Sequence, residues 1–200
     1  MKNMLSKQNH RNSERRWAGP ADFLQALNGQ WHRSAMFGFL IVVLAHWAEH
    51  LLQAYQIWIL HWHRPHAQGA LGLIFPWLVT SEWLHYGYAL IMLVGFLALR
   101  PAFTGRGLWW WNMALAIQFW HHFEHALLLG QALTHRYLLG GPTPTSLIQL
   151  VIPRVELHLF YNAVVFVPML VAMFYHRYPP TGEPYRPRCT CAHLGTPSFP

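Results

Sequence analysis

The sequence predicts an all-α integral membrane protein whose core is a four-helix bundle. Of its 200 residues, 54% are hydrophobic and 10% are charged, whereas about 25% of a soluble domain is charged. Four apolar stretches are long enough to cross a bilayer as helices, which takes about 20 residues each. All four stretches contain acidic residues and histidines. We therefore expect one compact membrane domain with polar groups in its interior.

The chain divides into four segments. Residues 1–19 are basic and predict a disordered cytoplasmic tail. Residues 20–33 alternate apolar and polar residues after Pro20, which predicts a short interfacial helix. The transmembrane domain is expected over residues 34–177, with spans at about 35–60, 71–99, 108–133 and 147–175. Residues 178–200 are rich in proline and predict a second cytoplasmic tail.

The net charge of +7 arises from basic residues at the ends of the apolar stretches. This distribution indicates membrane topology rather than nucleic-acid binding, because Lys and Arg gather on the cytoplasmic side. Both tails fall on that side. We expect an integral protein of the cytoplasmic (inner) membrane of a prokaryote, with both termini cytoplasmic and the lipid bilayer as its surroundings. The sequence leaves the oligomeric state open.

A His-x-x-Glu-His motif occurs twice. The first copy is His46, Glu49 and His50, and the second is His121, Glu124 and His125. On a helix, positions i, i+3 and i+4 share one face. A carboxylate at the centre of a membrane helix costs roughly 2.5–3.5 kcal/mol on insertion scales, so it requires a partner or a metal.

The second and fourth spans contribute further ligand-type residues at a similar depth. Glu82-x-x-His85 lies in one of them, and Glu156 with His158 lies in the other. At 1.5 Å rise per residue, the four clusters are expected in one layer. The proposed metal ligands are His46, Glu49, His50, Glu82, His85, His121, Glu124, His125, Glu156 and His158.

The motifs also suggest an internal repeat of two helices. Gln56 and Gln131 follow their motifs at equal offsets, and Tyr88 and Tyr161 follow a Leu-His pair in the same way. Such a repeat predicts a pseudo-twofold axis along the membrane normal. Residues expected around the ligands are Tyr88, Tyr161, Arg154, His122, Gln56 and Gln131. We expect Arg154 to pair with Glu156.

Imidazole and carboxylate donors together favour two metal ions, iron first and zinc or manganese as alternatives. The donor types resemble those of di-iron four-helix bundles, which use Glu and Glu-x-x-His; Glu82-x-x-His85 matches this spacing, and the two His-x-x-Glu motifs reverse it. The resemblance implies an oxidoreductase acting on oxygen and an apolar or quinol-type substrate, with an electron donor. On this interpretation, Glu49→Ala or Glu124→Ala abolishes metal retention.

Several alternatives remain open from the sequence. Paired histidines also suit haem b, and the same polar layer suits a divalent-metal or proton carrier. His-x-x-Glu-His is also the inverted zinc-peptidase motif, although one such site needs a single copy, and a structural subunit is the simplest alternative. Cys189 and Cys191 are expected to be reduced in the cytoplasmic tail, where they could hold a metal transiently.

Overall fold

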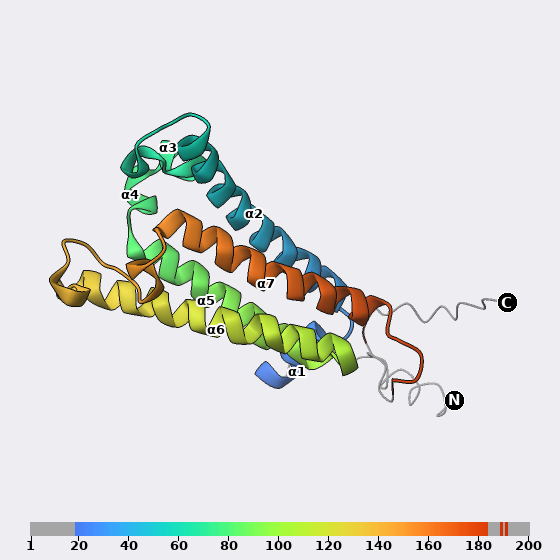
Figure 1. Ribbon diagram of the computed structural model, residues 1–200. Coiled ribbons are helices and arrows are strands. Elements are labelled where there is room, and N and C mark those ends of the chain that lie inside the picture. Colours follow the sequence, from blue (N-terminus) through green and yellow to red (C-terminus); the bar gives the residue numbers. More distant parts are fainter. Residues whose placement is uncertain (1–18, 184–188, 190, 192–200) are drawn as a thin grey trace, which may run out of the picture.

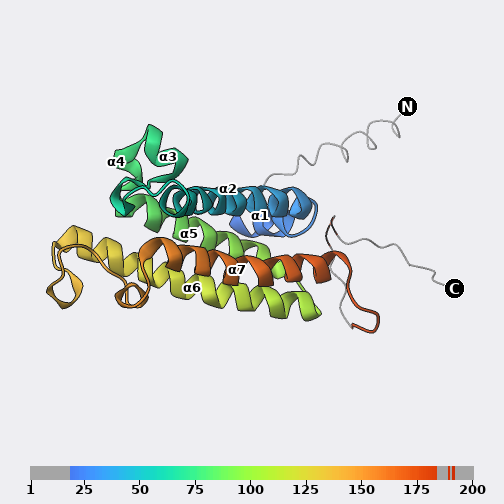
Figure 2. The same cartoon turned by 45° about the horizontal axis from the view of Figure 1, so that its top comes forward.

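The computed structural model describes residues 19–183 together with Cys189 and Cys191, and all regular elements in this part of the chain are helical. Four long helices lie side by side (Figures 1 and 2): α2 (His32–Trp58), α5 (Glu82–Leu99), α6 (Gly105–Thr134) and α7 (Arg154–Arg177). α6 packs against α7 and α5, and α2 packs against α7 and α5. The fold is therefore helical, as the sequence predicts.

Within the described residues, three segments are long and apolar enough to cross a membrane: His32–Trp58, Glu82–Ala102 and Arg154–Arg177. α6 is not among them, although it has 30 residues. Each of the four long helices nevertheless exposes large apolar side chains. Phe37 is 63% exposed, Ile91 58%, Phe119 62% and Val167 56%. An apolar exterior of this kind is consistent with a membrane protein.

The molecule has two distinct ends. The loop end contains α3 (Gly69–Ile74), α4 (Pro76–Val79) and the segment joining α6 to α7 (Figure 1). The termini end contains α1 (Pro20–Leu27), the start of α2 and the end of α7. The predicted tails lie almost entirely outside the described residues, which exclude 1–18, 184–188, 190 and 192–200.

The expected interfacial helix at 20–33 is shorter in the structure. α1 ends at Leu27, and α2 already begins at His32. Asn28 explains the boundary, because its amide donates to the carbonyls of Leu24 and Ala98 while its oxygen accepts from the amide of Ala102. These bonds fix α1 to the end of α5, at the short 3₁₀ turn η2 (Arg100–Ala102).

The expected second span, 71–99, is divided into three helices. α3 and α4 meet at Phe75, directly before Pro76, and α5 begins only at Glu82. Proline has no N–H and disfavours a helical residue before it, so the helix is interrupted there. Ser81 then caps α5, its hydroxyl accepting from the amide of Trp83. A further 3₁₀ turn, η1 (Arg64–His66), precedes α3.

The fourth span also begins later than the expected residue 147. Two 3₁₀ turns, η3 (Leu138–Gly140) and η4 (Ile148–Leu150), occupy the connection, and Pro153 stands at the N-cap of α7. As a result, Glu82 and Glu156 lie in the first turns of α5 and α7. Both carboxylates are therefore close to the loop end rather than at mid-helix.

The apolar core occupies the half of the molecule nearer the termini end. All four long helices contribute to it, through residues such as Phe39, Phe96, Trp111 and Met169. Trp111 is fully buried, and its indole N–H donates to the carbonyl of Phe96 at 2.9 Å. The other half of the helix interfaces carries the polar groups described next.

Candidate metal centre

Six histidines from the four long helices gather in the half of the molecule nearer the loop end. We call this group the histidine layer; it consists of His46 and His50 on α2, His85 on α5, His121 and His125 on α6, and His158 on α7. His50, His121, His125 and His158 are each at most 8% exposed. The structure thus brings together all the histidines proposed as ligands from the sequence.

Several of these imidazoles approach each other through their Nε2 atoms. The Nε2 atoms of His46 and His50 are 3.1 Å apart. His125 Nε2 lies 3.2 Å from His121 Nε2 and 3.3 Å from His158 Nε2. Ring contacts link the remaining members, since the ring centroids of His50 and His158 are 4.8 Å apart and those of His85 and His125 are 6.0 Å apart.

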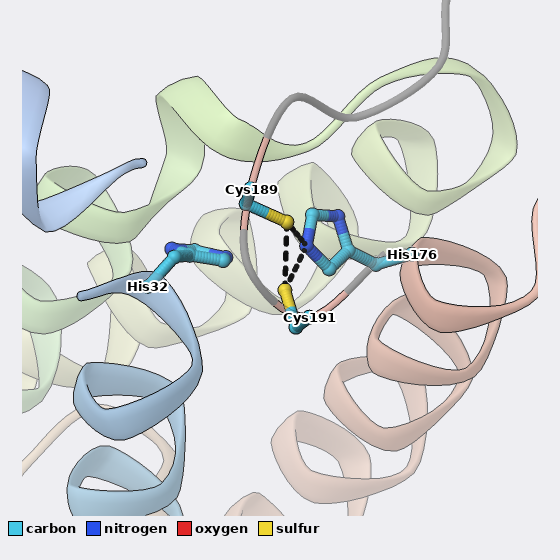
Figure 3. Close-up of side chains that lie close together, drawn as sticks. All are labelled: His32, His176, Cys189 and Cys191. Atoms are coloured by element: carbon cyan, nitrogen blue, oxygen red, sulfur yellow. Dashed lines mark hydrogen bonds between the residues drawn. The ribbon is translucent and has the colours of Figure 1, made fainter. Parts of the chain in front are cut away.

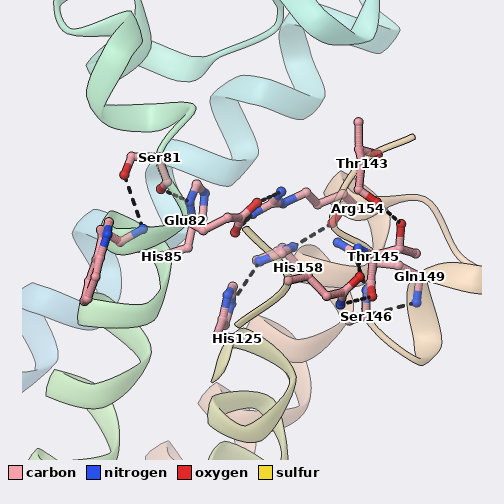
Figure 4. Close-up of polar contacts among 12 residues, drawn as sticks. Ser81, Glu82, His85, His125, Thr143, Thr145, Ser146, Gln149, Arg154 and His158 are labelled. Carbon is pink, nitrogen blue, oxygen red and sulfur yellow. Dashed lines mark hydrogen bonds and ion pairs between the residues drawn. The ribbon is translucent and has the colours of Figure 1, made fainter. Parts of the chain in front are cut away.

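In three of these histidines an acceptor holds the opposite ring nitrogen, whereas Nδ1 of His121 and Nδ1 of His125 make no hydrogen bond within the described residues. His85 donates from Nδ1 to the carbonyl of Ser81 at 3.1 Å, and His158 donates from Nδ1 to the carbonyl of Arg154 at 2.7 Å (Figure 4). His50 Nδ1 lies 2.7 Å from Gln53 Oε1. A neutral imidazole carries one N–H. With that N–H on Nδ1, the Nε2 atoms of His50, His85 and His158 keep their lone pairs. Bonds of this kind orient metal-binding histidines.

The distances between nitrogens fit shared metal coordination. Two imidazoles bound to one ion at about 2.0–2.1 Å place their nitrogens roughly 3 Å apart at a right angle and roughly 3.3 Å apart at the tetrahedral angle. The three Nε2 contacts span 3.1–3.3 Å. Without a metal, one N–H in each pair makes the contact a hydrogen bond, and a cation would take the place of that proton. The ligand atoms of His121, His125 and His158 all lie within 4.8 Å of one another.

The four carboxylates have other partners. Glu49 accepts from the amide of Leu71 at 2.8 Å. Glu124, which is 2% exposed, accepts from the amide of Ile148 at 3.1 Å and from the hydroxyl of Tyr161 at 2.6 Å. Both carboxylates therefore bind free N–H groups at the starts of short helices.

Glu82 and Glu156 form ion pairs with arginines. Arg154 makes two bonds of 2.7 Å to Glu82, and Arg64 makes two bonds of 2.6 and 2.8 Å to Glu156. The expected pairing of Arg154 with Glu156 is therefore wrong. Arg154 and Glu156 are only two residues apart in the sequence, but positions i and i+2 of a helix do not face each other, and the Arg154 guanidinium reaches α5 instead. The described contacts assign all four carboxylates to protein partners.

The residues expected around the ligands occupy varied positions. Tyr88 stacks on His46 with centroids 3.7 Å apart, and Tyr161 lies 4.3 Å from His121. Gln56 bonds both the amide and the carbonyl of Gly69. Gln131 bonds Thr145 in the same two ways. His122 lies beside Tyr86, with ring centroids 5.2 Å apart.

Two cavities adjoin the histidine layer. A cavity of about 710 Å³ at the loop end is lined by His50, His85 and His158, together with both ion-paired arginines. A much smaller cavity of about 10 Å³ is lined by His46, His121, Tyr88 and Tyr161. That volume is close to the minimum for one water molecule. The histidines can thus be reached from the loop end and surround room for one small ligand.

A second group of potential ligands lies at the termini end. It consists of His32, His176, Cys189 and Cys191 (Figure 3). The sequence drew attention to the two cysteines but not to these histidines, which lie at opposite ends of the transmembrane region. Hydrogen bonds from Cys191 and His176 lower the pKa of the Cys189 thiol to about 3.

No protein-family model matches the chain, and no curated protein or solved structure shows significant similarity to it.

Proposed function

We propose that the chain is a membrane metalloprotein whose histidine layer binds a dinuclear transition-metal centre within a transmembrane four-helix bundle. The observation that carries the proposal is the convergence of Nε2 atoms at 3.1–3.3 Å, with the opposite nitrogens of His85 and His158 bound to carbonyls. One metal position would use His46 and His50, and the other would use His121, His125 and His158. His85 lies beside the second group.

The donor set bears on the choice of metal. Since the carboxylates are engaged by backbone amides, Tyr161 and arginines, the available donors are imidazoles, which suit iron, copper and zinc. The chemistry we favour is that of an oxidoreductase, with iron or copper supplying one-electron exchange. Tyr88 and Tyr161 support this proposal, because each places a phenol ring against a histidine of one group.

The cavities suggest how reactants reach the layer. The small cavity between the two tyrosines suits a ligand of the size of oxygen or water. The larger cavity reaches His50, His85 and His158 from the loop end. A quinol-type substrate could donate electrons from the bilayer by way of Tyr88 on α5, which is partly exposed, whereas Tyr161 on α7 is buried.

A divalent-metal carrier is the second candidate, favoured by the same loop-end cavity. Its lining combines the ion pair of Glu82 and Arg154 with three histidines, so a cation could exchange there without crossing apolar packing. Haem b is less compatible with the observed contacts. Two axial histidines on one haem iron hold their nitrogens about 4 Å apart, twice a metal–nitrogen bond, which exceeds the Nε2 separations found here.

The first experiment is metal analysis and visible spectroscopy of detergent-purified protein. About two iron or copper ions per chain without a Soret band would support the proposal, and we would then measure oxygen consumption with quinols. A Soret band would instead indicate haem, and weakly held zinc or manganese would favour a carrier.

Two variants on α6 give a matched comparison. His125→Ala removes the ring that contacts both His121 and His158, and it should remove the metal ion assigned to these three histidines. His122→Ala removes a neighbouring ring outside the layer and should leave the metal content unchanged. Equal metal content in the two variants would overturn the proposal.

A further inference from the structure

A separate cluster of side chains closes the termini end of the molecule. His32 is the first residue of α2, and His176 lies in the last turn of α7. Cys189 and Cys191 follow α7 and lie against the two histidines (Figure 3). The cluster thus joins the first and last long helices to the segment that follows them.

The four ligand atoms are close together. His176 Nε2 lies 3.0 Å from Cys189 Sγ and 2.8 Å from Cys191 Sγ. One ligand atom from each of the four residues can be chosen so that all lie within 4.8 Å of one another. Tetrahedral zinc with bonds of about 2.3 Å to sulfur and about 2.0–2.1 Å to nitrogen requires ligand separations of roughly 3.3–3.8 Å. The Sγ atoms of Cys189 and Cys191 are 2.7 Å apart, so zinc binding would require the two sulfur atoms to separate by about 1 Å.

The histidines of this cluster are deeply buried and have unused nitrogens. His32 is 0% exposed, and neither of its ring nitrogens makes a hydrogen bond within the described residues. His176 is 3% exposed, and its Nδ1 has no partner there either. A buried polar group without a hydrogen bond costs about 1–3 kcal/mol. Bonding to a metal would satisfy a nitrogen that no described group satisfies.

Aromatic packing supports both imidazoles. Phe103 lies 4.5 Å from His176 and 5.8 Å from His32, measured between ring centroids. Phe103 also stacks on the fully buried Trp111 at 4.1 Å. The ligand pair therefore rests on the apolar core, which holds the rings in place, while a cavity of about 740 Å³ reaches His176 and Cys191.

From this geometry we infer that His32, His176, Cys189 and Cys191 form a zinc site distinct from the histidine layer. Two thiolates and two imidazoles in a tetrahedral arrangement are typical of structural zinc. Zinc binding would attach the segment containing both cysteines to α2 and α7. The site differs from the histidine layer in its sulfur donors and in its position at the opposite end of the long helices.

The test uses the full-length protein in detergent, purified under reducing conditions and loaded with zinc alone. We expect Cys189→Ser, Cys191→Ser and His176→Gln each to bind one zinc per chain fewer than the unsubstituted protein, and Thr190→Ala, the matched control between the cysteines, to bind the same number. His125→Ala should also retain this zinc, so failure of the proposed function and failure of this inference are distinguishable. Zinc content unaffected by the cysteine and His176 substitutions would overturn the inference.

Cobalt(II) and thiol alkylation provide independent readouts. Cobalt(II) at this site should give sulfur-to-metal charge-transfer absorption and tetrahedral ligand-field bands, both absent in Cys189→Ser. Zinc should slow alkylation of the two thiols by about tenfold or more, because a metal-bound thiolate is a poor nucleophile. Unchanged alkylation with zinc, or a disulfide between Cys189 and Cys191 in the reduced preparation, would exclude the site.

Discussion

Substitution of Glu124 distinguishes a carboxylate that binds metal from one that stabilises the fold. Its two oxygens accept from the amide of Ile148 and from the hydroxyl of Tyr161, at 3.1 and 2.6 Å. Glu124→Gln keeps the size of the side chain and an acceptor oxygen but removes the charge. We therefore expect this variant to fold and to retain its metal.

The expected change in the free energy of unfolding follows from these two hydrogen bonds. A hydrogen bond to a charged group contributes about 1.5–3 kcal/mol, and a neutral one about 0.5–1.5 kcal/mol. In Glu124→Gln the amide oxygen can still accept from Ile148, and the amide nitrogen, which cannot accept, would donate to the Tyr161 oxygen instead. Both bonds then become neutral, which should lower the free energy of unfolding by about 2–3 kcal/mol. Glu124→Ala leaves both donors without an acceptor, at about 1–3 kcal/mol each, and should lower it by about 2–6 kcal/mol.

The assay combines denaturant unfolding in detergent with metal analysis of the folded fraction. Glu49→Gln is the matched control, because Glu49 also accepts from an amide at the start of a short helix, that of Leu71. Both glutamine variants should hold as much metal as the unsubstituted protein. A Glu124→Gln protein that unfolds normally but has lost its metal would refute this reasoning and restore Glu124 as a ligand.

Two further predictions concern the loop end. Arg154→Ala should lower the free energy of unfolding by about 1–3 kcal/mol, because it leaves Glu82, whose side chain is 10% exposed, without its partner. Arg64→Ala removes the more exposed ion pair and should lower the free energy of unfolding by at most about 1 kcal/mol. Equal losses of stability in the two variants, measured by thermal unfolding, would contradict the argument from burial. Gly69→Ala should lower the free energy of unfolding by about 1 kcal/mol or more. Gly69 has φ +71°, and an added Cβ would meet the carboxylate of Glu49. Gly87→Ala, whose Cβ would meet nothing within 4 Å, is its control and should be neutral or stabilising; the same unfolding loss in both variants would rule out that cause.

The helical fold and the histidines of the layer were predictable because they depend on local spacing. His46 and His50, like His121 and His125, are four residues apart, and any regular helix places such pairs on one face. The Nε2 contacts of 3.1 and 3.2 Å within these pairs follow directly from that spacing. Burial of this face was also predictable, since polar groups in an apolar helix avoid lipid.

The partners of the carboxylates were not predictable in the same way. The spacing placed Glu49 and Glu124 near the histidines, but their partners are amides more than 20 residues away in short helices that the sequence did not indicate. Those helices exist because Pro76 and Pro153 stop regular helix formation at the loop end. The pairing of Arg154 with Glu82 likewise depends on how α5 and α7 pack.

The interruption of the second span also determines how far into the membrane potential His85 lies. His85 lies in the first turn of α5, about 5 Å along a helix of roughly 27 Å at 1.5 Å per residue. In an energised bilayer, moving one charge through the whole membrane potential involves about 2.3 kcal/mol per 100 mV. A cation entering through the loop-end cavity would cross only a small part of that potential, whereas one arriving from the termini end would cross most of it. Loading of His85 and His158 from the loop end should therefore depend less on voltage than loading from the termini end.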